Sequence, residues 1–394
     1  MDTIQTAVNY RQLPRPTWAE IDLDAIENNI DAFLDVLGKD VSLIVAAKGN
    51  GYGHGMLPIV KLLESKDIYG FATGNIYEAI QMRKAGIRKP IQLFAHNFPE
   101  TAGLLAEYGL MPSFVNPEDA AAYAEALGRD TPLKVWVKCD TGLGRLGLHP
   151  DEVLPMLAYI QKETAFQVEG LYTHIGPVDS SENPQKEEYN HYQMQQFRQL
   201  IQKVEDAGYH IPKYQFSSTY AAQRYPEAWY NAVCVGTALF ADAQPRPPRI
   251  GLGLKNCLKG IHSRLISTKT HAAGNRCLNR LIERETRIGI VPFGSCDGFS
   301  TRNVGKEVLL CGARCPVMAV CLEHTVLDIT AVPQAQVGDI VTFLGVNGGD
   351  RVTVDEYCRY LGITEIEFWC SLSYHSFPHI YVRNNAVSEI VIYS

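Results

Sequence analysis

The sequence predicts an α/β fold: an N-terminal TIM-type (β/α)8 barrel followed by a C-terminal, mainly-β domain. Three observations support this. Eight short apolar runs alternate with longer amphipathic segments through the first two thirds of the chain. Beyond a proline-rich stretch, strand-like runs follow one another closely. The length of 394 residues also exceeds what a single hydrophobic core usually organises, so two domains are expected.

The expected barrel strands are short and mostly apolar. Helical patterns lie between them, as at residues 76–86 and 116–128, and both of these end in a glycine that commonly closes a helix. Strands that alternate with helices form a parallel sheet, and eight such units favour a closed barrel; an open doubly wound sheet is the alternative. The expected strands cover residues 43–48, 69–74, 90–95, 111–115, 134–140, 168–175, 213–219 and 232–241.

The C-terminal region follows a different pattern. Its strand-like runs lack long helices between them, apart from one short helical pattern at residues 353–362. We place the barrel at residues 1–243, a proline-rich joint at 244–254 and the β domain at 255–394, and we expect the arm at 1–15 to pack with the β domain. The expected strands of this domain cover residues 287–293, 307–312, 315–322, 324–330 and 339–345.

Composition narrows the class of function. The formal charge of −7, with no basic block, argues against nucleic acid as a partner. No apolar stretch is long enough to span a bilayer, and the N-terminus lacks a signal-peptide core, so we expect no membrane partner. The ten cysteines have no paired CxxC spacing, and Cys311 with Cys315 lacks further ligands for a metal. A cytoplasmic enzyme with a small-molecule substrate is expected.

Polar residues at the expected strand ends suggest a cofactor. Catalytic groups of such barrels lie at the C-terminal ends of the strands, and the loops after strands seven and eight commonly bind phosphate. A lysine that ends a buried strand is rare unless it is paired or chemically engaged. The residues at these strand ends are Lys48 on strand one, Lys138 and Asp140 on strand five with Arg145 beyond it, His174 on strand six, Ser217, Ser218 and Thr219 on strand seven, and Cys234, Gly236 and Thr237 on strand eight. A reactive lysine opposite a phosphate cradle suggests pyridoxal 5'-phosphate (PLP), held by Lys48 as a Schiff base.

A series of ordered motifs also resembles a known family. The chain resembles the alanine racemases, which are fold-type III PLP enzymes, over nearly its whole length. The motifs are RPTWAEIDLDAIENNI (15–30), VAAKGNGYGHG (45–55), VKCDTGLGRLG (137–147), GLYTHI (170–175), HSRL (262–265), PFGSCDGF (292–299), CLEHTVLDIT (321–330) and FPHIYVR (377–383).

The resemblance implies roles for individual residues. Lys48 would bind PLP and act as the base on one face of the substrate Cα, and Arg145 would bind the cofactor's phenolic oxygen and the substrate carboxylate. Lys138 stands where the family often carries a carbamylated lysine that orients this arginine; an ordinary ion-pair network with Asp140 is the alternative. The other cofactor-binding positions are Tyr52, His174, Ser218, Thr219, Cys234, Gly236, Thr237 and Tyr381, the last of which would also line the substrate's access path.

Several positions depart from the family pattern. The resemblance implies a second catalytic residue, the first tyrosine of the motif G-Y-A-D-G-Y, which acts from the partner subunit. In this chain Ser295 occupies the position of that tyrosine and Cys296 follows it. The second tyrosine of the substrate entry is lost around Leu278 and Asn279. Cys234 stands where the family places an arginine against the pyridine nitrogen. Leu322 and Glu323 replace a methionine–aspartate pair in the substrate pocket.

These departures leave three interpretations open. The first is a racemase or epimerase with a substitute second acid, for which Cys296 is the first candidate and Glu323 and His324 are others, with Ser295 beside them. The second is a one-base PLP enzyme of the same fold, such as an aldolase, a side-chain transferase or a decarboxylase. The third is a non-catalytic PLP-binding protein. The resemblance further implies an isologous homodimer in which Ser295 and Leu322 act on the partner's barrel.

Overall fold

The computed structural model describes residue 10 and residues 13–175, 184–216, 218–240, 250–372 and 376–392. The chain divides into two compact units. The barrel unit comprises residues 27–51 and 59–254, and the strand-rich unit comprises residues 1–26, 52–58 and 255–394. The proposed joint at 244–254 falls mostly outside the described residues.

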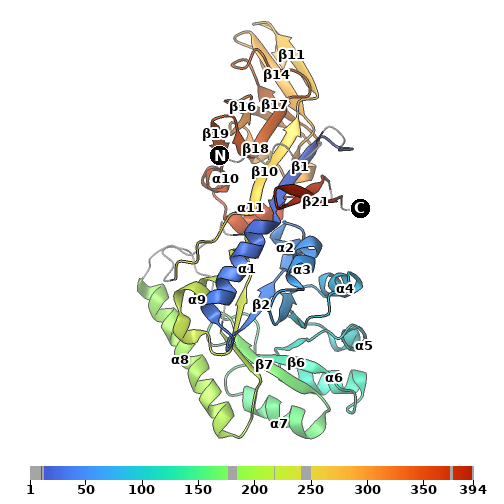
Figure 1. The fold of residues 1–394 in the computed structure, drawn as a ribbon, viewed down its shortest axis with the longest axis vertical. Helices are drawn as coiled ribbons and strands as arrows, with labels where there is room; N and C mark the ends of the chain where they lie inside the picture. Colours follow the sequence, from blue (N-terminus) through green and yellow to red (C-terminus); the bar gives the residue numbers. More distant parts are fainter. Residues whose placement is uncertain are drawn as a thin grey trace. The chain divides into compact units, whose positions relative to one another are not determined.

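The barrel unit confirms the expected parallel architecture (Figure 1). Among the described residues, eight parallel strands pair in the order β4-β3-β2-β9-β8-β7-β6-β5. An isolated parallel bridge between Gln92 and Met111 links the two end strands, so the sheet is a nearly closed barrel rather than an open doubly wound sheet. The strands are β2 (Ser42–Ala46), β3 (Gly70–Thr73), β4 (Ile91–Leu93), β5 (Ser113–Phe114), β6 (Lys134–Lys138), β7 (Gln167–Thr173), β8 (Lys213–Phe216) and β9 (Ala232–Val235).

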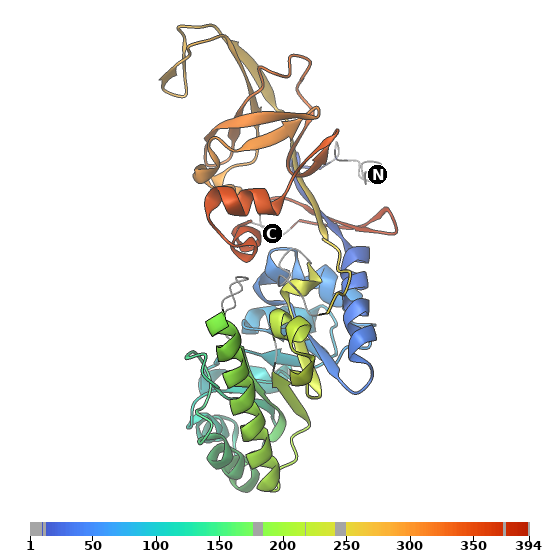
Figure 2. The same ribbon diagram turned by 90° about the vertical axis from the view of Figure 1, so that its left-hand side faces the viewer.

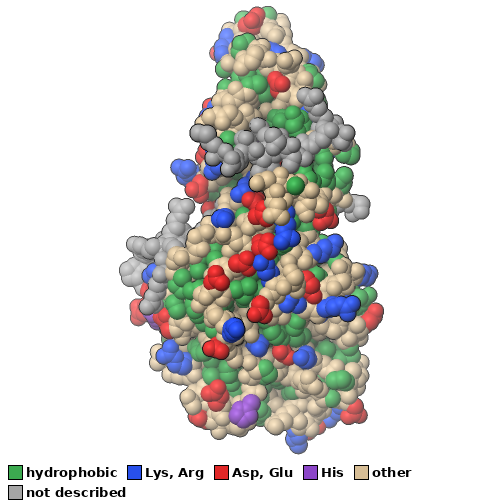
Figure 3. All heavy atoms as spheres, in the orientation of Figure 1, with side chains coloured by type: hydrophobic (Ala, Val, Ile, Leu, Met, Phe, Trp, Pro, Cys, Tyr) green, Lys and Arg blue, Asp and Glu red, His purple; other side chains and the backbone are tan. Residues whose placement is uncertain are grey.

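Helices surround these strands, as the two views in Figures 1 and 2 show. They are α1 (Leu23–Leu37), α3 (Met56–Leu63), α4 (Ile76–Lys84), α5 (Ala102–Glu107), α6 (Asp119–Leu127), α7 (Val153–Glu163), α8 (Pro184–Asp206) and α9 (Thr219–Arg224). Within the described part of the chain, no helix combines the length and apolar character that crossing a membrane requires. Acidic and basic side chains are interspersed over the face shown in Figure 3.

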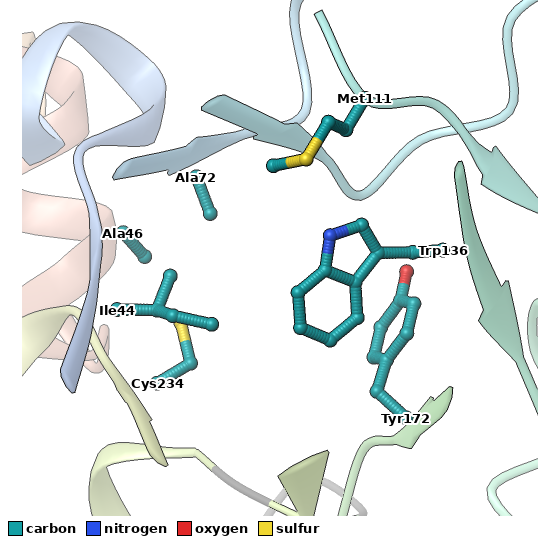
Figure 4. Packing of buried hydrophobic residues seen from close by; sticks show 7 residues of the cluster. All are labelled: Ile44, Ala46, Ala72, Met111, Trp136, Tyr172 and Cys234. Atoms are coloured by element: carbon teal, nitrogen blue, oxygen red, sulfur yellow. The ribbon is translucent and has the colours of Figure 1, made fainter. Parts of the chain in front are cut away.

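Strand register determines which side chains fill the barrel. Alternate residues of each strand point inward, and they bring Trp136 and Tyr172 into near-perpendicular contact, with 5.9 Å between ring centroids (Figure 4). Gly170 makes room for this pair, because a Cβ at that position would lie 2.2 Å from the Trp136 ring. Ile44 and Cys234 lie across the interior on the neighbouring strands β2 and β9. The barrel is therefore a packed core with its polar residues near the strand ends.

The strand-rich unit contains, among the described residues, an eleven-stranded sheet and a two-stranded hairpin. The sheet strands are β1 (Thr17–Asp22), β10 (Leu258–Arg264), β11 (Ser267–His271), β14 (Thr286–Val291), β15 (Glu307–Leu310), β16 (Ala313–Val320), β17 (Thr325–Asp328), β18 (Ile340–Asn347), β19 (Asp350–Val352), β20 (His379–Arg383) and β21 (Ala386–Val391). The hairpin consists of β12 (Arg276–Cys277) and β13 (Arg280–Leu281), and the helices are α10 (Val354–Leu361) and α11 (Glu365–Ser371).

The N-terminal strand β1 enters this second sheet. It pairs antiparallel with β10 and parallel with β20. Only the arm at 1–15 was expected beside the β domain, whereas the structure assigns all residues up to Ile26 to the strand-rich unit. The reason is that β1 is buried in a mainly antiparallel sheet, where its Trp18 packs with Ile380 and Val382.

Candidate active site

Lys48 begins a rare left-handed turn. It follows β2 and starts the short helix α2 (Lys48–Tyr52), in which Gly49, Asn50, Gly51 and Tyr52 have φ values of 62°, 49°, 64° and 52°. Residues with side chains avoid this conformation because their Cβ approaches the following carbonyl oxygen, whereas glycine adopts it freely and asparagine tolerates it. The left-handed backbone of this turn therefore explains why glycine is so frequent after Lys48.

A carboxylate of α4 fixes the same turn. The backbone N–H of Asn50 donates to Glu78 Oε1 at 2.6 Å, and the hydroxyl of Thr73 donates to the other oxygen of Glu78. Glu78 thereby ties the residues after Lys48 to the end of β3. Sequence reasoning missed Glu78, because a glutamate in an amphipathic helical pattern gives no signal that distinguishes it from a solvent-facing residue.

Lys138 lies inside the barrel with an altered proton affinity. Its side chain is 4% exposed, and Nζ lies 5.5 Å from the centroid of the Tyr172 ring. Burial, followed by the charge of Arg145, lowers the pKa of Lys138 to about 8; Asp140 opposes this shift and Lys48 adds to it. Because the charges of Arg145 and Lys48 both act on Lys138, these three cationic side chains lie near one another at the strand ends.

Asp140 organises the loop that carries Arg145. Its Oδ1 accepts hydrogen bonds from the N–H groups of Gly142 and Gly144 at 2.9 and 3.1 Å, and its Oδ2 accepts one from the N–H of Arg145 at 2.9 Å. Although burial opposes the shift, these backbone donors hold the pKa of Asp140 below its usual range. The backbone of the loop is thus bound to the Asp140 carboxylate, and the Arg145 side chain remains exposed.

His174 follows the end of β7 and is half-buried. Its backbone carbonyl accepts a hydrogen bond from Gln193 Nε2 at 3.4 Å. The preceding Thr173 forms a 2.9 Å hydroxyl–hydroxyl hydrogen bond with Thr141, which lies beyond β6. These contacts fix the backbone at the strand end from which the imidazole projects.

The ends of β8 and β9 meet at a cluster of hydroxyls and N–H groups. Thr219 begins α9, and its Oγ1 accepts hydrogen bonds from the N–H of Gly236 at 3.0 Å and of Ala238 at 3.3 Å. Ser218 caps α9 by accepting the N–H of Ala221 at 3.2 Å. Thr237 begins the adjoining 3-10 turn η5 (Thr237–Leu239). Ser217, also expected here, lies outside the described residues.

Cys234 on β9 is a buried, neutral thiol. It pairs in register with Ile44 of β2 and is 6% exposed. Burial raises the pKa of Cys234 to about 12, and the nearby Lys48 opposes the shift. A thiol with this pKa carries no charge at neutral pH.

In the strand-rich unit, the structure joins two of the predicted segments. Ser295 and Cys296 begin the turn η6 (Ser295–Asp297), and their N–H groups donate to the carbonyls of Cys321 and Leu322, both at 2.9 Å. Gly294 permits this approach, since a Cβ there would lie 2.5 Å from the Leu322 carbonyl oxygen. Ser295, Cys296, Leu322 and Glu323 therefore form one exposed surface.

Tyr381 contacts the chain segment that follows the left-handed turn. Its hydroxyl donates to the carbonyl of His54 at 2.8 Å, and both residues belong to the strand-rich unit. Tyr52 is buried at the start of the same 52–58 segment. Gly53 has no room for a side chain, since a Cβ would lie 2.3 Å from the Trp369 carbonyl oxygen.

The chain also lacks tyrosine throughout a long region: none lies between Tyr230 and Tyr357. Leu278 and Asn279 form the two-residue connection between β12 and β13, with φ values of 51° and 59°. Two successive positive φ values in a two-residue loop are characteristic of a type I′ hairpin turn. Within the described residues no group of three or more histidine, cysteine, aspartate or glutamate side chains could hold a metal ion.

Comparison with known proteins identifies the family. Residues 21–244 match the family model "Alanine racemase, N-terminal domain", and residues 260–381 match "Alanine racemase, C-terminal domain". The chain belongs to the alanine racemase family. It is 31% identical to the alanine racemase of Anoxybacillus flavithermus over 388 residues, which cover 95% of this chain and 97% of that one. It is 28% identical to the alanine racemase of Methanococcus maripaludis, with coverage of 93% and 99%.

Solved alanine racemases share the fold over almost the entire chain. The Bacillus anthracis alanine racemase with bound L-Ala-P superposes with a TM-score of 0.87 at 25% identity, covering 96% of this chain and 98% of that one. The alanine racemase from E. faecalis gives a TM-score of 0.85 at 27% identity, with coverage of 96% and 100%. Enzymes of this family are PLP-dependent isomerases, and racemase-like PLP chemistry is accordingly assigned to this chain.

Proposed function

We propose that this protein is a PLP-dependent amino-acid racemase or epimerase in which a group other than tyrosine serves as the second acid at Cα. The single observation that carries this proposal is that the barrel unit keeps the family's lysines and arginine, whereas the strand-rich unit lacks a tyrosine in the region where the family has its second acid. The barrel retains Lys48, Lys138 and Arg145 around one set of strand ends, while no tyrosine lies between residues 230 and 357.

The residues at the strand ends fit PLP. A primary amine lies after β2, and hydroxyl and N–H donors suited to a phosphate lie after β8 and β9. Cys234, on the strand beside Lys48, offers a neutral thiol that suits an unprotonated pyridine nitrogen. Ser218, Thr219, Gly236 and Thr237 would hold the phosphate, and His174 would lie beside the ring. When bound, PLP withdraws electrons from the substrate Cα and makes its proton acidic.

Lys48 would anchor the cofactor and hold the proton removed from one face of Cα. Arg145 would bind the substrate carboxylate through its planar guanidinium, which matches a carboxylate in two-point geometry. Asp140 fixes the backbone of this arginine through the N–H hydrogen bonds described above. Lys138, which is buried and feels the charges of Arg145 and Asp140, would influence Arg145 through its charge state. Tyr52 and Tyr381 would contribute to cofactor binding from the 52–58 segment and β20.

Cys296 is the preferred second acid. Partial burial and the neighbouring Asp297 raise its pKa, against the opposing charge of Arg15, so the thiol holds its proton at neutral pH. The serine hydroxyl of Ser295 is much less acidic than a thiol and would need an activating partner. Glu323 and His324 lie on the adjoining loop and are the remaining candidates.

A one-base PLP enzyme is the second candidate function. The side chains of Ser295, Leu322 and Leu278 would be smaller than those that the family usually has at these positions, and smaller groups would enlarge the substrate pocket. Such changes favour a bulkier substrate. With Lys48 as the sole acid–base group, any exchange of the Cα proton would retain configuration. The reaction itself would break another bond of Cα: the bond to the side chain in side-chain transfer or aldol-type cleavage, and the bond to the carboxylate in decarboxylation.

The exposed surface formed by Ser295, Cys296, Leu322 and Glu323 supports a homodimer in which each active site uses residues of both copies. Leu322 is 68% exposed, and Ser295, Cys296 and Glu323 are exposed beside it. An exposed leucine among candidate catalytic groups suits a surface that covers the barrel of a second copy. Sedimentation velocity is expected to give a dimer. A monomer that turns over substrate would contradict this arrangement.

The reaction is tested by incubating the PLP-loaded protein with individual D- and L-amino acids in D2O. Proton NMR follows the loss of the Cα–H signal, and chiral chromatography follows configuration. We expect deuterium incorporation together with appearance of the opposite enantiomer. Incorporation with full retention of configuration would instead establish the one-base enzyme, and an absence of exchange with every amino acid would contradict both.

A further inference from the structure

Arg15 joins three segments of the strand-rich unit. Its guanidinium forms a two-point ion pair with Asp297, with Nη1–Oδ1 at 2.7 Å and Nη2–Oδ2 at 2.8 Å. Nη1 also donates to the carbonyl of Ser376 at 2.5 Å, and Nη2 donates to that of Pro292 at 3.2 Å. One side chain from the N-terminal region therefore reaches both ends of the turn that contains Ser295 and Cys296.

Asp297 transmits this anchoring to the turn itself. Its side chain is fully buried, and Oδ2 accepts the N–H of Gly294 at 2.8 Å. A buried carboxylate that loses its cationic partner is strongly destabilising, so Asp297 depends on Arg15. Because Gly294 and Asp297 flank Ser295 and Cys296, their hydrogen bond fixes the backbone of both candidate residues.

The same two charged groups act on the adjacent Cys296 thiol. Partial burial and the Asp297 carboxylate raise the pKa of this thiol, and the Arg15 guanidinium opposes that effect. The adjoining loop, whose Leu322 carbonyl accepts the N–H of Cys296, also carries the titratable groups of Cys321, Glu323 and His324. We infer that Arg15 and Asp297 are positioning residues, which hold the turn that carries Cys296 and set one cation and one anion beside its thiol.

This inference deepens the proposed function and rests on it for its catalytic meaning. A proton donor at Cα must hold its proton at neutral pH and still be able to release it. The Asp297 carboxylate favours the protonated thiol, and the Arg15 guanidinium favours the thiolate. The two opposed charges partly cancel in their effect on the pKa of the thiol. Removing the anion should therefore lower this pKa, and removing the cation should raise it.

The test measures the pH dependence of Cys296 alkylation by iodoacetamide, read by mass spectrometry after trypsin digestion. The tryptic peptide 288–302 contains Cys296 as its only cysteine, so its labelling needs no background substitutions. Cys321, an exposed cysteine in the peptide 315–351, provides an internal control in the same digest. This readout requires neither substrate nor a known reaction.

The variants are Arg15→Gln, Arg15→Lys, Asp297→Asn and the double variant Arg15→Gln/Asp297→Asn. We expect the labelling midpoint of Cys296 to rise by about one pH unit in Arg15→Gln and to fall by about one unit in Asp297→Asn. Arg15→Lys keeps the charge and should lie near the native protein, as should the double variant. Arg284→Gln, which breaks an exposed ion pair with Asp328 in the same unit, should leave the midpoint unchanged.

Shifts in opposite directions separate an electrostatic role from loosening of the turn, because loosening would move the Arg15 and Asp297 variants in the same direction. Equal or absent shifts would overturn the inference. The Arg15→Lys and Asp297→Asn variants, which avoid an unpaired buried carboxylate, keep the test decisive if Arg15→Gln does not fold. If the native protein exchanges no Cα proton, the proposed function fails, whereas the labelling midpoints still decide the role of Arg15.

Discussion

The ammonium of Lys138 lies over the ring of Tyr172, with Nζ 5.5 Å from the ring centroid. The aromatic face attracts a cation, but the burial of Lys138 and the charges of Arg145 and Lys48 lower its pKa to about 8. Below pH 8 this buried lysine is protonated, and its buried charge lowers the free energy of unfolding. The barrel should therefore be more stable when an uncharged side chain replaces it.

Replacing Lys138 by methionine should stabilise the protein at neutral pH. Between pH 8 and the unfolded-state pKa of 10.5, the unfolded chain holds a proton that the folded chain lacks, so stability rises with pH in that window and the full penalty applies below it. Lys138→Met should therefore raise the free energy of unfolding by about 2 to 3 kcal/mol at pH 6.5, and the gain should shrink as pH rises towards 10. Urea unfolding in bicarbonate-free buffer measures this.

Lys134, at the opposite end of the same strand, supplies the matched control. Its side chain is exposed and pairs with Glu169 at 3.0 Å. Lys134→Met should change the free energy of unfolding by less than about 1 kcal/mol at any of these pH values. A Lys138→Met variant whose stability relative to the native protein does not vary with pH would contradict the lowered pKa.

Lys138 is also expected to form a carbamate with dissolved CO2. An amine with a pKa of about 8 is partly unprotonated near neutral pH, and its nitrogen can attack CO2, forming a C–N bond and releasing one proton. The product is an anion suited to the neighbouring Arg145. Carbon-13 NMR in labelled bicarbonate should show a carbamate signal that disappears in Lys138→Met and persists in Lys134→Met; a spectrum without that signal would favour an uncarbamylated lysine.

Asp140→Asn should weaken substrate binding through Arg145. The amide is a weaker acceptor than the carboxylate for the three backbone N–H groups of the loop, so the backbone that carries the Arg145 guanidinium is held less firmly. We expect KM in the Cα-exchange assay to rise about tenfold, equivalent to about 1.4 kcal/mol, with a smaller change in kcat. Asp151→Asn, an exposed acid in the same region, is the control. Equal changes in KM for the two variants would rule out this role.

Gly49→Ala should destabilise the left-handed turn after Lys48. No atom lies within 4 Å of a Cβ at this position, so the cost comes only from the backbone φ of 62° and should be about 1 kcal/mol. Gly103 in α5 also has open space around it but has no positive φ, so Gly103→Ala should be neutral or stabilising. Thermal unfolding of the two variants compares them directly. Similar melting temperatures would argue against a left-handed requirement.

The barrel was predictable from the sequence because its pattern is local. Each of the eight strands is a short apolar run between helical patterns, and all eight expected runs contain a strand in the structure. The observed strands are shorter than expected, as at 232–241, where β9 ends at Val235 and a 3-10 turn follows. Glycine and hydroxyl residues at strand ends leave the sheet to form loops, which an apolar-run criterion does not separate from the strand.

Long-range partners were not predictable in the same way. Nothing near Arg15 in the sequence points to Asp297, which is 282 residues away, and nothing in β1 indicates that it pairs with β10 rather than with the barrel. Glu78 supports the turn after Lys48 from a helix whose pattern is simply amphipathic. Such contacts depend on tertiary packing, so they emerge only from the folded structure.

The central claim is that Cys296 replaces the missing tyrosine as the proton donor on one face of Cα. The most direct measurement compares Cα-proton exchange rates of the two substrate enantiomers in D2O for the native protein, Cys296→Ala and the neighbouring control Cys321→Ala. We predict that Cys296→Ala slows exchange from one enantiomer by at least about a hundredfold, while exchange from the other, which depends on Lys48, is retained. Equal slowing of both enantiomers, or no slowing of either, would contradict the claim.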